Sequence, residues 1–123
     1  VVMTELNRVL KLNGKILITI PFAWGEHEQP YDFARYTSFG LKSILEQNGF
    51  EIVEHIKTAN YIETVFQTLT AYLYHSVVPK GLRTILTLTL IAPLNILGIF
   101  LGKVLPIDKS YYLNNIMLCV KIK

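Results

Sequence analysis

The stretch LKLNGKILITIPF, residues 10–22, decides the fold class of this chain. Gly14 suits the left-handed turn that closes a helix, and the β-branched run after it predicts a short strand that Pro21 stops. Before the turn, apolar residues recur at helical spacing, at Val2, Leu6, Val9 and Leu10. The sequence therefore predicts a helix, a tight turn and a strand.

The same pattern recurs directly downstream. Thr37 or Ser38 caps a second predicted helix, which Asn48 and Gly49 close. The apolar residues that fall on one side of this helix are Phe39, Leu41, Ile44 and Leu45. Residues 50–56, FEIVEHI, follow as the next strand. Helices alternating with apolar strands predict an α/β fold whose sheet is largely parallel and covered on both faces.

The chain changes character after residue 60. Residues 60–78 predict a one-sided helix, from which Glu63, Gln67 and Thr70 point away. Its apolar positions are Ile62, Val65, Phe66, Leu69, Leu73 and Val77. Residues 84–102 carry no charge and are apolar on all sides of a helix that Pro93 and Gly98 interrupt. Residues 116–120 are all apolar, which predicts a strand buried on both faces.

The composition excludes several classes of protein for this chain. A chain of 123 residues forms one domain or part of one, and 51% hydrophobic residues with a mean hydropathy of +0.37 argue against disorder. The net charge of +3 is small and the basic residues are scattered, so no nucleic-acid partner is expected. Cys119 is the single cysteine, which excludes an internal disulfide and favours the reducing cytoplasm. No secretory signal is visible.

Two segments carry a resemblance to a known family. Residues 5–22, ELNRVLKLNGKILITIPF, and residues 31–54, YDFARYTSFGLKSILEQNGFEIVE, resemble the C-terminal half of a class I S-adenosylmethionine-dependent methyltransferase of the type 11 kind. In that family a Leu-Lys-Pro-Gly-Gly turn feeds the fifth strand, and a substrate loop, an Arg-Tyr/Phe-Thr helix start and the sixth strand follow. Here Leu12 and Asn13 replace the proline and the first glycine.

The resemblance implies a Rossmann-like fold, of which this chain would supply strands five, six and seven. Residues 116–122 resemble the seventh strand, which by family topology inserts antiparallel between the fifth and the sixth. Residues 1–123 are then a partial methyltransferase domain, and residues 60–106 are an apolar helical insertion within it.

The cofactor implied by the family is S-adenosylmethionine, but the motifs that bind it are not in this sequence. The family holds it on the first half of the sheet, with a Gly-rich turn and an acidic residue, and the seven glycines here never form Gly-x-Gly-x-x-Gly. We therefore assign no cofactor-binding residue in this chain. We expect it to be the back half of a longer enzyme and to be inactive by itself.

The loop GEHEQPYDFARYTSFG, residues 25–40, is the predicted substrate loop. An enzyme that transfers an activated methyl group gains mainly by aligning the acceptor and by taking up its proton. The catalytic candidates for that proton are His27, Glu28 and Asp32. The candidates for binding an anionic or sugar-like acceptor are Arg35 and Tyr36, with Trp24 beside them as a wall of the site.

Simpler interpretations compete with these roles. Arg35 pairs with Asp32 to hold the loop, His27 and Glu28 are solvated, and Thr37 is a helix cap. No metal site is predicted, because His27 and Glu28 do not form a His-Glu-x-x-His motif with another histidine. Cys119 in its apolar strand is a core residue rather than a nucleophile.

An alternative hypothesis assigns the chain to noncatalytic interaction modules, which would use the apolar helices to bind a membrane or another protein. If the chain is part of an enzyme, we expect it to methylate a small-molecule, sugar or lipid-linked acceptor. We expect a cytoplasmic location, either free in solution or at a membrane surface that the apolar insertion contacts. The strand Ile16 to Ile20 would expose an apolar sheet edge if the fragment stood alone, which predicts a homo-oligomer.

Overall fold

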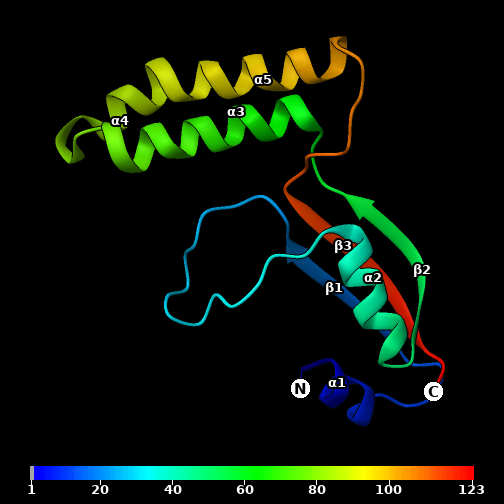
Figure 1. Cartoon of the computed structure of the whole chain (residues 1–123). Coiled ribbons are helices and arrows are strands. Elements are labelled where there is room, and N and C mark those ends of the chain that lie inside the picture. The colour runs from blue at the N-terminus through cyan, green and yellow to red at the C-terminus, as the bar shows by residue number, and fades with distance from the viewer. Residues whose placement is uncertain (1) are drawn as a thin grey trace. The chain divides into compact units, whose positions relative to one another are not determined.

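A computed structural model describes residues 2–123 of the chain. These residues divide into two compact units (Figure 1). The first unit combines residues 2–58 with residues 113–123, and the second is Ala59–Tyr112. The predicted insertion, residues 60–106, lies within the second unit.

The first unit contains a three-stranded sheet in the order β1-β3-β2. Strands β1 (Lys15–Pro21) and β2 (Phe50–Lys57) both pair antiparallel with β3 (Asn114–Lys121), which lies between them (Figure 1). The predicted central, antiparallel place of the last strand is confirmed. The prediction of a largely parallel sheet is wrong for this unit, because β3 separates the two strands that run in the same direction.

Two helices, α1 (Val2–Val9) and α2 (Ser38–Gln47), form a hydrophobic core with one face of this sheet. The residues buried in this core are Ile18, Leu41, Leu45, Phe50, Met117 and Cys119. The opposite face is not covered within the unit, since Leu17, which points to it from β1, is 65% exposed. The prediction that the sheet is covered on both faces is therefore wrong for this unit.

The packing also corrects three sequence assignments. The residues of α1 that pack on the core are Met3 and Leu6, whereas Val2 and Val9 are exposed, because the helix is rotated relative to the predicted face. Phe39 is exposed, since it lies two positions from Leu41, about 200° around the helix. Strand β3 buries alternate side chains instead of both faces, as a sheet covered on one face requires.

Local chemistry explains where these elements begin and end. Asn13, at φ 63°, takes the left-handed position predicted for Gly14. Gly49 follows α2 at φ +82°, and a Cβ there would lie 3.0 Å from the carbonyl oxygen of Lys123. The predicted cap is confirmed, because Thr37 Oγ1 accepts a hydrogen bond of 3.1 Å from the amide of Gly40.

The second unit is a helical hairpin. Its first arm is α3 (Tyr61–Tyr72), continued by the π-helical turn η1 (Leu73–Val77). Its second arm comprises the 3₁₀ turn η2 (Lys80–Leu82), α4 (Arg83–Leu86), the π-helical turn η3 (Thr87–Ile91) and α5 (Ala92–Val104). The arms pack side by side through α3 and α5 (Figure 1).

Neither of the two predicted helix breakers separates the second arm into parts. Pro93 occupies the first turn of α5, where its missing N–H is tolerated, and Gly98 lies in the middle of that helix. A continuous helical stretch therefore runs over Lys80–Val104. The predicted interruption at Pro93 and Gly98 is wrong.

The predicted apolar face of the first arm is only partly turned inward. Thr64 and Thr70 are the buried residues of α3, and Gly98 and Gly102 are those of α5. Large apolar side chains of the predicted inner face, Val65, Leu69 and Val77, are exposed instead. The fully buried residues of α3 and α5 are therefore small or polar, while Phe66 of the predicted apolar face still packs against Gly98 of the partner arm.

Candidate functional site

One end of the sheet gathers most of the polar side chains predicted to act. In the register, Pro21 lies opposite Asn114 and Lys57 lies opposite Asn115, so the carboxyl ends of β1 and β2 meet the start of β3. Residues 22–37 leave β1 at this end and return to α2. The predicted substrate loop and the last residues of β2 therefore lie at the same end of the sheet.

Arg35 organises the loop. Its Nη1 and Nη2 donate to the two carboxylate oxygens of Asp32 in a bidentate ion pair. The same guanidinium donates to the carbonyl oxygens of Trp24, at 3.4 Å, and Gly25, at 3.1 Å. One side chain thus joins the start of the loop to its end, which is the structural role that the simpler interpretation assigned to it.

The electrostatics of this pair decide what Asp32 can do. The hydrogen bonds from Arg35 hold the pKa of the Asp32 carboxyl below its usual range, and the pKa of the Arg35 guanidinium is raised in turn. A carboxylate with a lowered pKa and both oxygens engaged is a weak proton acceptor. Asp32 is therefore suited to holding the loop rather than to general base catalysis.

His27 lies against this ion pair. Its backbone amide donates to Asp32 Oδ2 over 3.2 Å, and its Nδ1 lies 3.4 Å from the same oxygen and 3.2 Å from the carbonyl oxygen of Gly25. The imidazole side chain is 49% exposed, so an incoming molecule can reach it. Of the three predicted catalytic residues, His27 combines access with a fixed position.

The other predicted residues lie outside this cluster. Glu28 is exposed, and its backbone carbonyl accepts a hydrogen bond of 2.7 Å from the amide of Tyr31. Tyr36 is half-buried and packs on the hydrophobic core. Trp24 is 40% exposed and joins the cluster through its backbone alone. The structure thus brings together His27, Asp32, Arg35 and the Trp24 carbonyl, and separates Glu28 and the Tyr36 ring from them.

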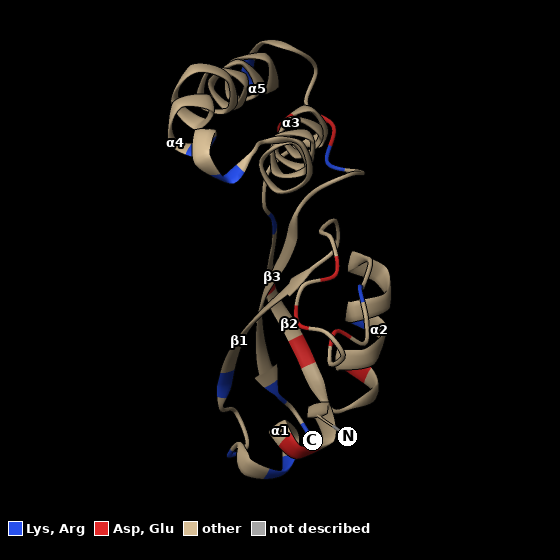
Figure 2. Cartoon of the chain, turned by 90° about the vertical axis from the view of Figure 1, so that its left-hand side faces the viewer, with Lys and Arg blue, Asp and Glu red and all other residues tan. Residues whose placement is uncertain are grey.

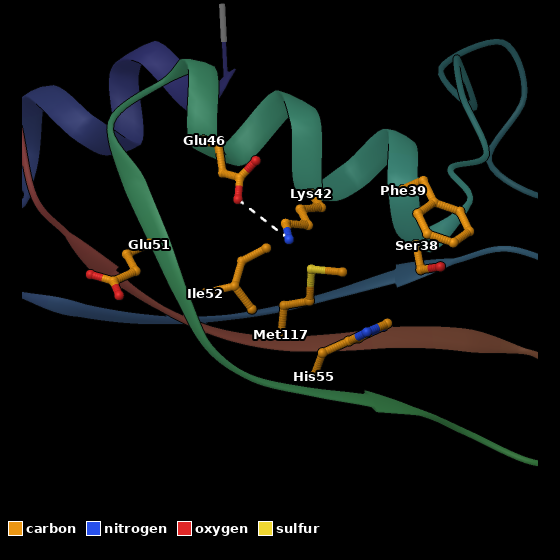
Figure 3. Close-up of a pocket in the computed structure, with 8 residues that line it drawn as sticks. All are labelled: Ser38, Phe39, Lys42, Glu46, Glu51, Ile52, His55 and Met117. Atoms are coloured by element: carbon orange, nitrogen blue, oxygen red, sulfur yellow. Dashed lines mark ion pairs between the residues drawn. The ribbon is translucent and has the colours of Figure 1, made fainter.

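A groove of about 400 Å³ lies between α2 and the sheet. Figure 3 shows Lys42 and Glu46 on its helix side and His55 and Met117 on its sheet side. Phe39 and Ser38 line it at the start of α2. The Lys42–Glu46 ion pair, at 3.7 Å, is exposed on both sides and contributes little to stability.

His55 is the titratable side chain of this groove that the fold fixes in place. Its Nε2 lies 3.0 Å from Oδ1 of Asn115, which is fully buried, and Asn115 Nδ2 donates to the carbonyl of Tyr36 over 2.9 Å. An amide oxygen only accepts, so His55 Nε2 is the donor in this contact. Asn115 of β3 thereby links Tyr36, near the end of the loop, to His55 in the groove.

The sequence did not identify His55 or Asn115 as residues of a candidate site. The available signal was an asparagine at the start of an otherwise apolar strand, because a buried amide must find hydrogen-bond partners. Partners as distant as Tyr36 and His55 are visible only in the tertiary structure.

The described residues form no metal site, and none of them is assigned to a cofactor. Among residues 2–123, no group of three or more His, Cys, Asp and Glu side chains is placed to hold a metal ion. Two glycines are closely packed, since a Cβ on Gly98 would meet Phe66 and one on Gly102 would meet Glu63. No residue of this part of the chain is assigned to S-adenosylmethionine.

Cys119 lies in the core, away from these groups. It is fully buried in β3, and this burial raises the pKa of its thiol. A protonated, inaccessible thiol is a packing residue.

Comparison with family models, with curated proteins and with solved structures finds no match for this chain.

Proposed function

We propose that this chain is the C-terminal portion of a Rossmann-like, S-adenosylmethionine-dependent methyltransferase and supplies the acceptor side of its active site. The observation that carries the proposal is the sheet order β1-β3-β2, in which an antiparallel last strand separates two strands of common direction. The sequence resemblance predicts this order. The segments that carry the resemblance, residues 5–22 and 31–54, also form the elements expected of them.

The loop supports the proposal by its position and its rigidity. It leaves the carboxyl end of β1, the edge at which ligands bind in open α/β sheets. The Arg35–Asp32 pair fixes the loop, so His27 is held in place at its surface. In this proposal His27 takes the proton of an oxygen or nitrogen acceptor, and Arg35 and Asp32 are positioning residues.

His55 is a second proton acceptor in the proposed site. Asn115 accepts a hydrogen bond from its Nε2, and the groove beside it has aromatic and aliphatic walls in Phe39, Ile52 and Met117. Such walls suit an acceptor with an apolar part. The cofactor would be held by residues that precede this sequence in the natural protein.

The first test is the intact mass and N-terminal sequence of the natural protein. We expect upstream residues that form a strand, a Gly-rich turn and a helix. A natural protein that begins near Val1 would refute the methyltransferase hypothesis and favour the alternative, a noncatalytic interaction module.

The second test is the release of S-adenosylhomocysteine by the natural protein with candidate acceptors. If His27 is the general base, His27→Ala lowers turnover by about 100-fold or more, since such a base contributes 10²–10⁴-fold. His75→Ala is the matched control, because this exposed histidine belongs to the second unit. Equal activity of the two variants would show that His27 is not the general base.

A further inference from the structure

We propose that the hairpin, residues 61–104, is embedded in a lipid bilayer with its outer surface in contact with acyl chains. This inference does not depend on methyl transfer. Its basis is the burial pattern of the hairpin: the buried residues of α3 and α5 are small or polar, and most large apolar side chains of the hairpin are exposed or half-buried, with Val78 and Ile91 as the buried exceptions. Water favours the opposite arrangement, whereas lipid favours this one.

The apolar surface surrounds the second arm. Between Ile96 and Phe100 only Gly98 is buried, and the other four residues are exposed. Successive helix residues are 100° apart, so these four side chains point to nearly every direction that the first arm does not occupy. A soluble amphipathic helix has an apolar stripe on one side only. A protein partner on one side would leave the rest of this surface in water, and a bilayer covers all of it.

Several polar side chains of the hairpin are satisfied inside it, as lipid favours, whereas the buried Thr64 Oγ1 and Arg83 Nε have no hydrogen-bond partner among the described residues. Thr70 Oγ1 donates to Asn95 Oδ1 over 2.9 Å between the arms, and Asn60 Nδ2 donates to the Gly102 carbonyl over 2.8 Å at the base. Thr89 Oγ1 donates to the carbonyl of Ile85 over 2.9 Å, within its own helix. Two polar residues of the apolar stretch, Thr89 and Asn95, therefore have hydrogen-bond partners.

The arms approach closely through glycine. A Cβ on Gly98 would lie 2.5 Å from the Cβ of Phe66, so only glycine allows this contact. Close packing of small residues is the main source of helix association where lipid removes the hydrophobic driving force. The hairpin is thus joined by packing and hydrogen bonds rather than by a shared apolar core.

Length and charge agree with a bilayer. The helical stretch Lys80–Val104 has 25 residues, a mean hydropathy of 2.1 in its most apolar window, and only 17% of that window is buried. Its uncharged part, residues 84–102, is about 28 Å long at 1.5 Å per residue, close to a hydrocarbon core of about 30 Å. The hairpin carries three basic residues, Lys80, Arg83 and Lys103, and one acidic residue, Glu63, in the first turn of α3. These cations complement anionic headgroups.

Figure 2 shows the same distribution, with basic residues near α4 and little charge along α3 and α5. At the tip, the Arg83 guanidinium lies 4.9 Å from the centre of the Tyr74 ring. At the base, the rings of Tyr61 and Tyr111 lie 5.2 Å apart. Tyrosine and basic side chains at both ends of an apolar segment are typical of the two membrane interfaces.

Tryptophan fluorescence with bromine on the lipid acyl chains tests this proposal. The natural Trp24 is first replaced by Phe, and Leu97→Trp and Ile99→Trp are then made separately in the full chain, reconstituted in vesicles of phosphatidylcholine and phosphatidylglycerol. These two positions flank Gly98, are 44% and 50% exposed, and point to opposite sides of the hairpin. We expect brominated lipid to quench both. Quenching of one position alone indicates a hairpin lying on the surface, and quenching of neither indicates no insertion; both results overturn the proposal.

Leu17→Trp is the matched control, because Leu17 is an equally apolar position with 65% exposure in the first unit. Flotation with the same vesicles gives an independent readout. Leu88→Asp lowers vesicle partition on the order of 100-fold, whereas Leu17→Asp leaves it unchanged. Equal effects of the two aspartates, or no effect of either, would contradict an embedded hairpin.

Discussion

Replacement of Asn115 by leucine is the sharpest test of how the first unit is held together. Asn115 is fully buried, and its amide joins the Tyr36 carbonyl at the end of the loop to His55 on β2. Leucine has a similar volume, so Asn115→Leu removes the hydrogen bonds and leaves little cavity. The Tyr36 carbonyl then loses its donor from β3, whereas the exposed ring of His55 can turn to water.

The expected magnitude follows from this difference between the two partners. A buried acceptor left without its hydrogen bond costs about 1–3 kcal/mol, and the solvated His55 ring adds little. We therefore expect the free energy of unfolding of the first unit to fall by about 2 kcal/mol. With a urea dependence of about 1–3 kcal/mol per molar, the midpoint moves down by about 1 M.

The assay is urea unfolding followed by the fluorescence of Trp24 in a mild nonionic detergent. Trp24 is the only tryptophan and belongs to the first unit, so the signal reports on that unit alone. Asn114→Leu is the matched control, because the adjacent side chain is half-buried and its amide makes only a 3.3 Å hydrogen bond to Thr58 Oγ1. Equal unfolding midpoints for the two leucine variants would refute the anchoring role of Asn115.

Three further outcomes follow from other contacts. Arg35→Ala releases the loop and increases its cleavage by protease, and equal cleavage of the variant and the natural chain would contradict this. Because the pKa of Asp32 is lower in the folded chain, the stability that this pair contributes is fully present above about pH 3.9 and is lost as the pH falls through the lower folded pKa. Thr37→Ala removes the cap of α2 and lowers stability by about 1 kcal/mol in urea, whereas Thr37→Ser retains it; equal midpoints for both would exclude the cap. Gly98→Ala forces the arms apart and lowers the thermal unfolding temperature followed by circular dichroism, and Gly81→Ala, where a Cβ meets open space, leaves it unchanged; a Gly98→Ala variant as stable as Gly81→Ala would refute the close contact.

Much of the first unit was predictable because its signals are local. The strand Lys15–Pro21 and the Thr37 cap agree with the prediction, since β-branched runs, proline and capping residues act on the backbone beside them. The pairing of Arg35 with Asp32 was also foreseen, because three residues separate the two charges. The contacts of His55 and Tyr36 with Asn115 were not, because 60 and 79 residues separate them.

The sequence by itself determined the elements of this protein and their order, because helix spacing, strand composition and turn residues act over a few positions. Tertiary structure alone decided which way the elements face. A period of 3.6 residues marks two sides of α3 without stating which one is inside, and Thr70 faces Asn95 whereas Leu69 is exposed. A helical period shows that the two faces of a helix differ in polarity. The packing partner and the solvent alone decide which of the two faces is buried.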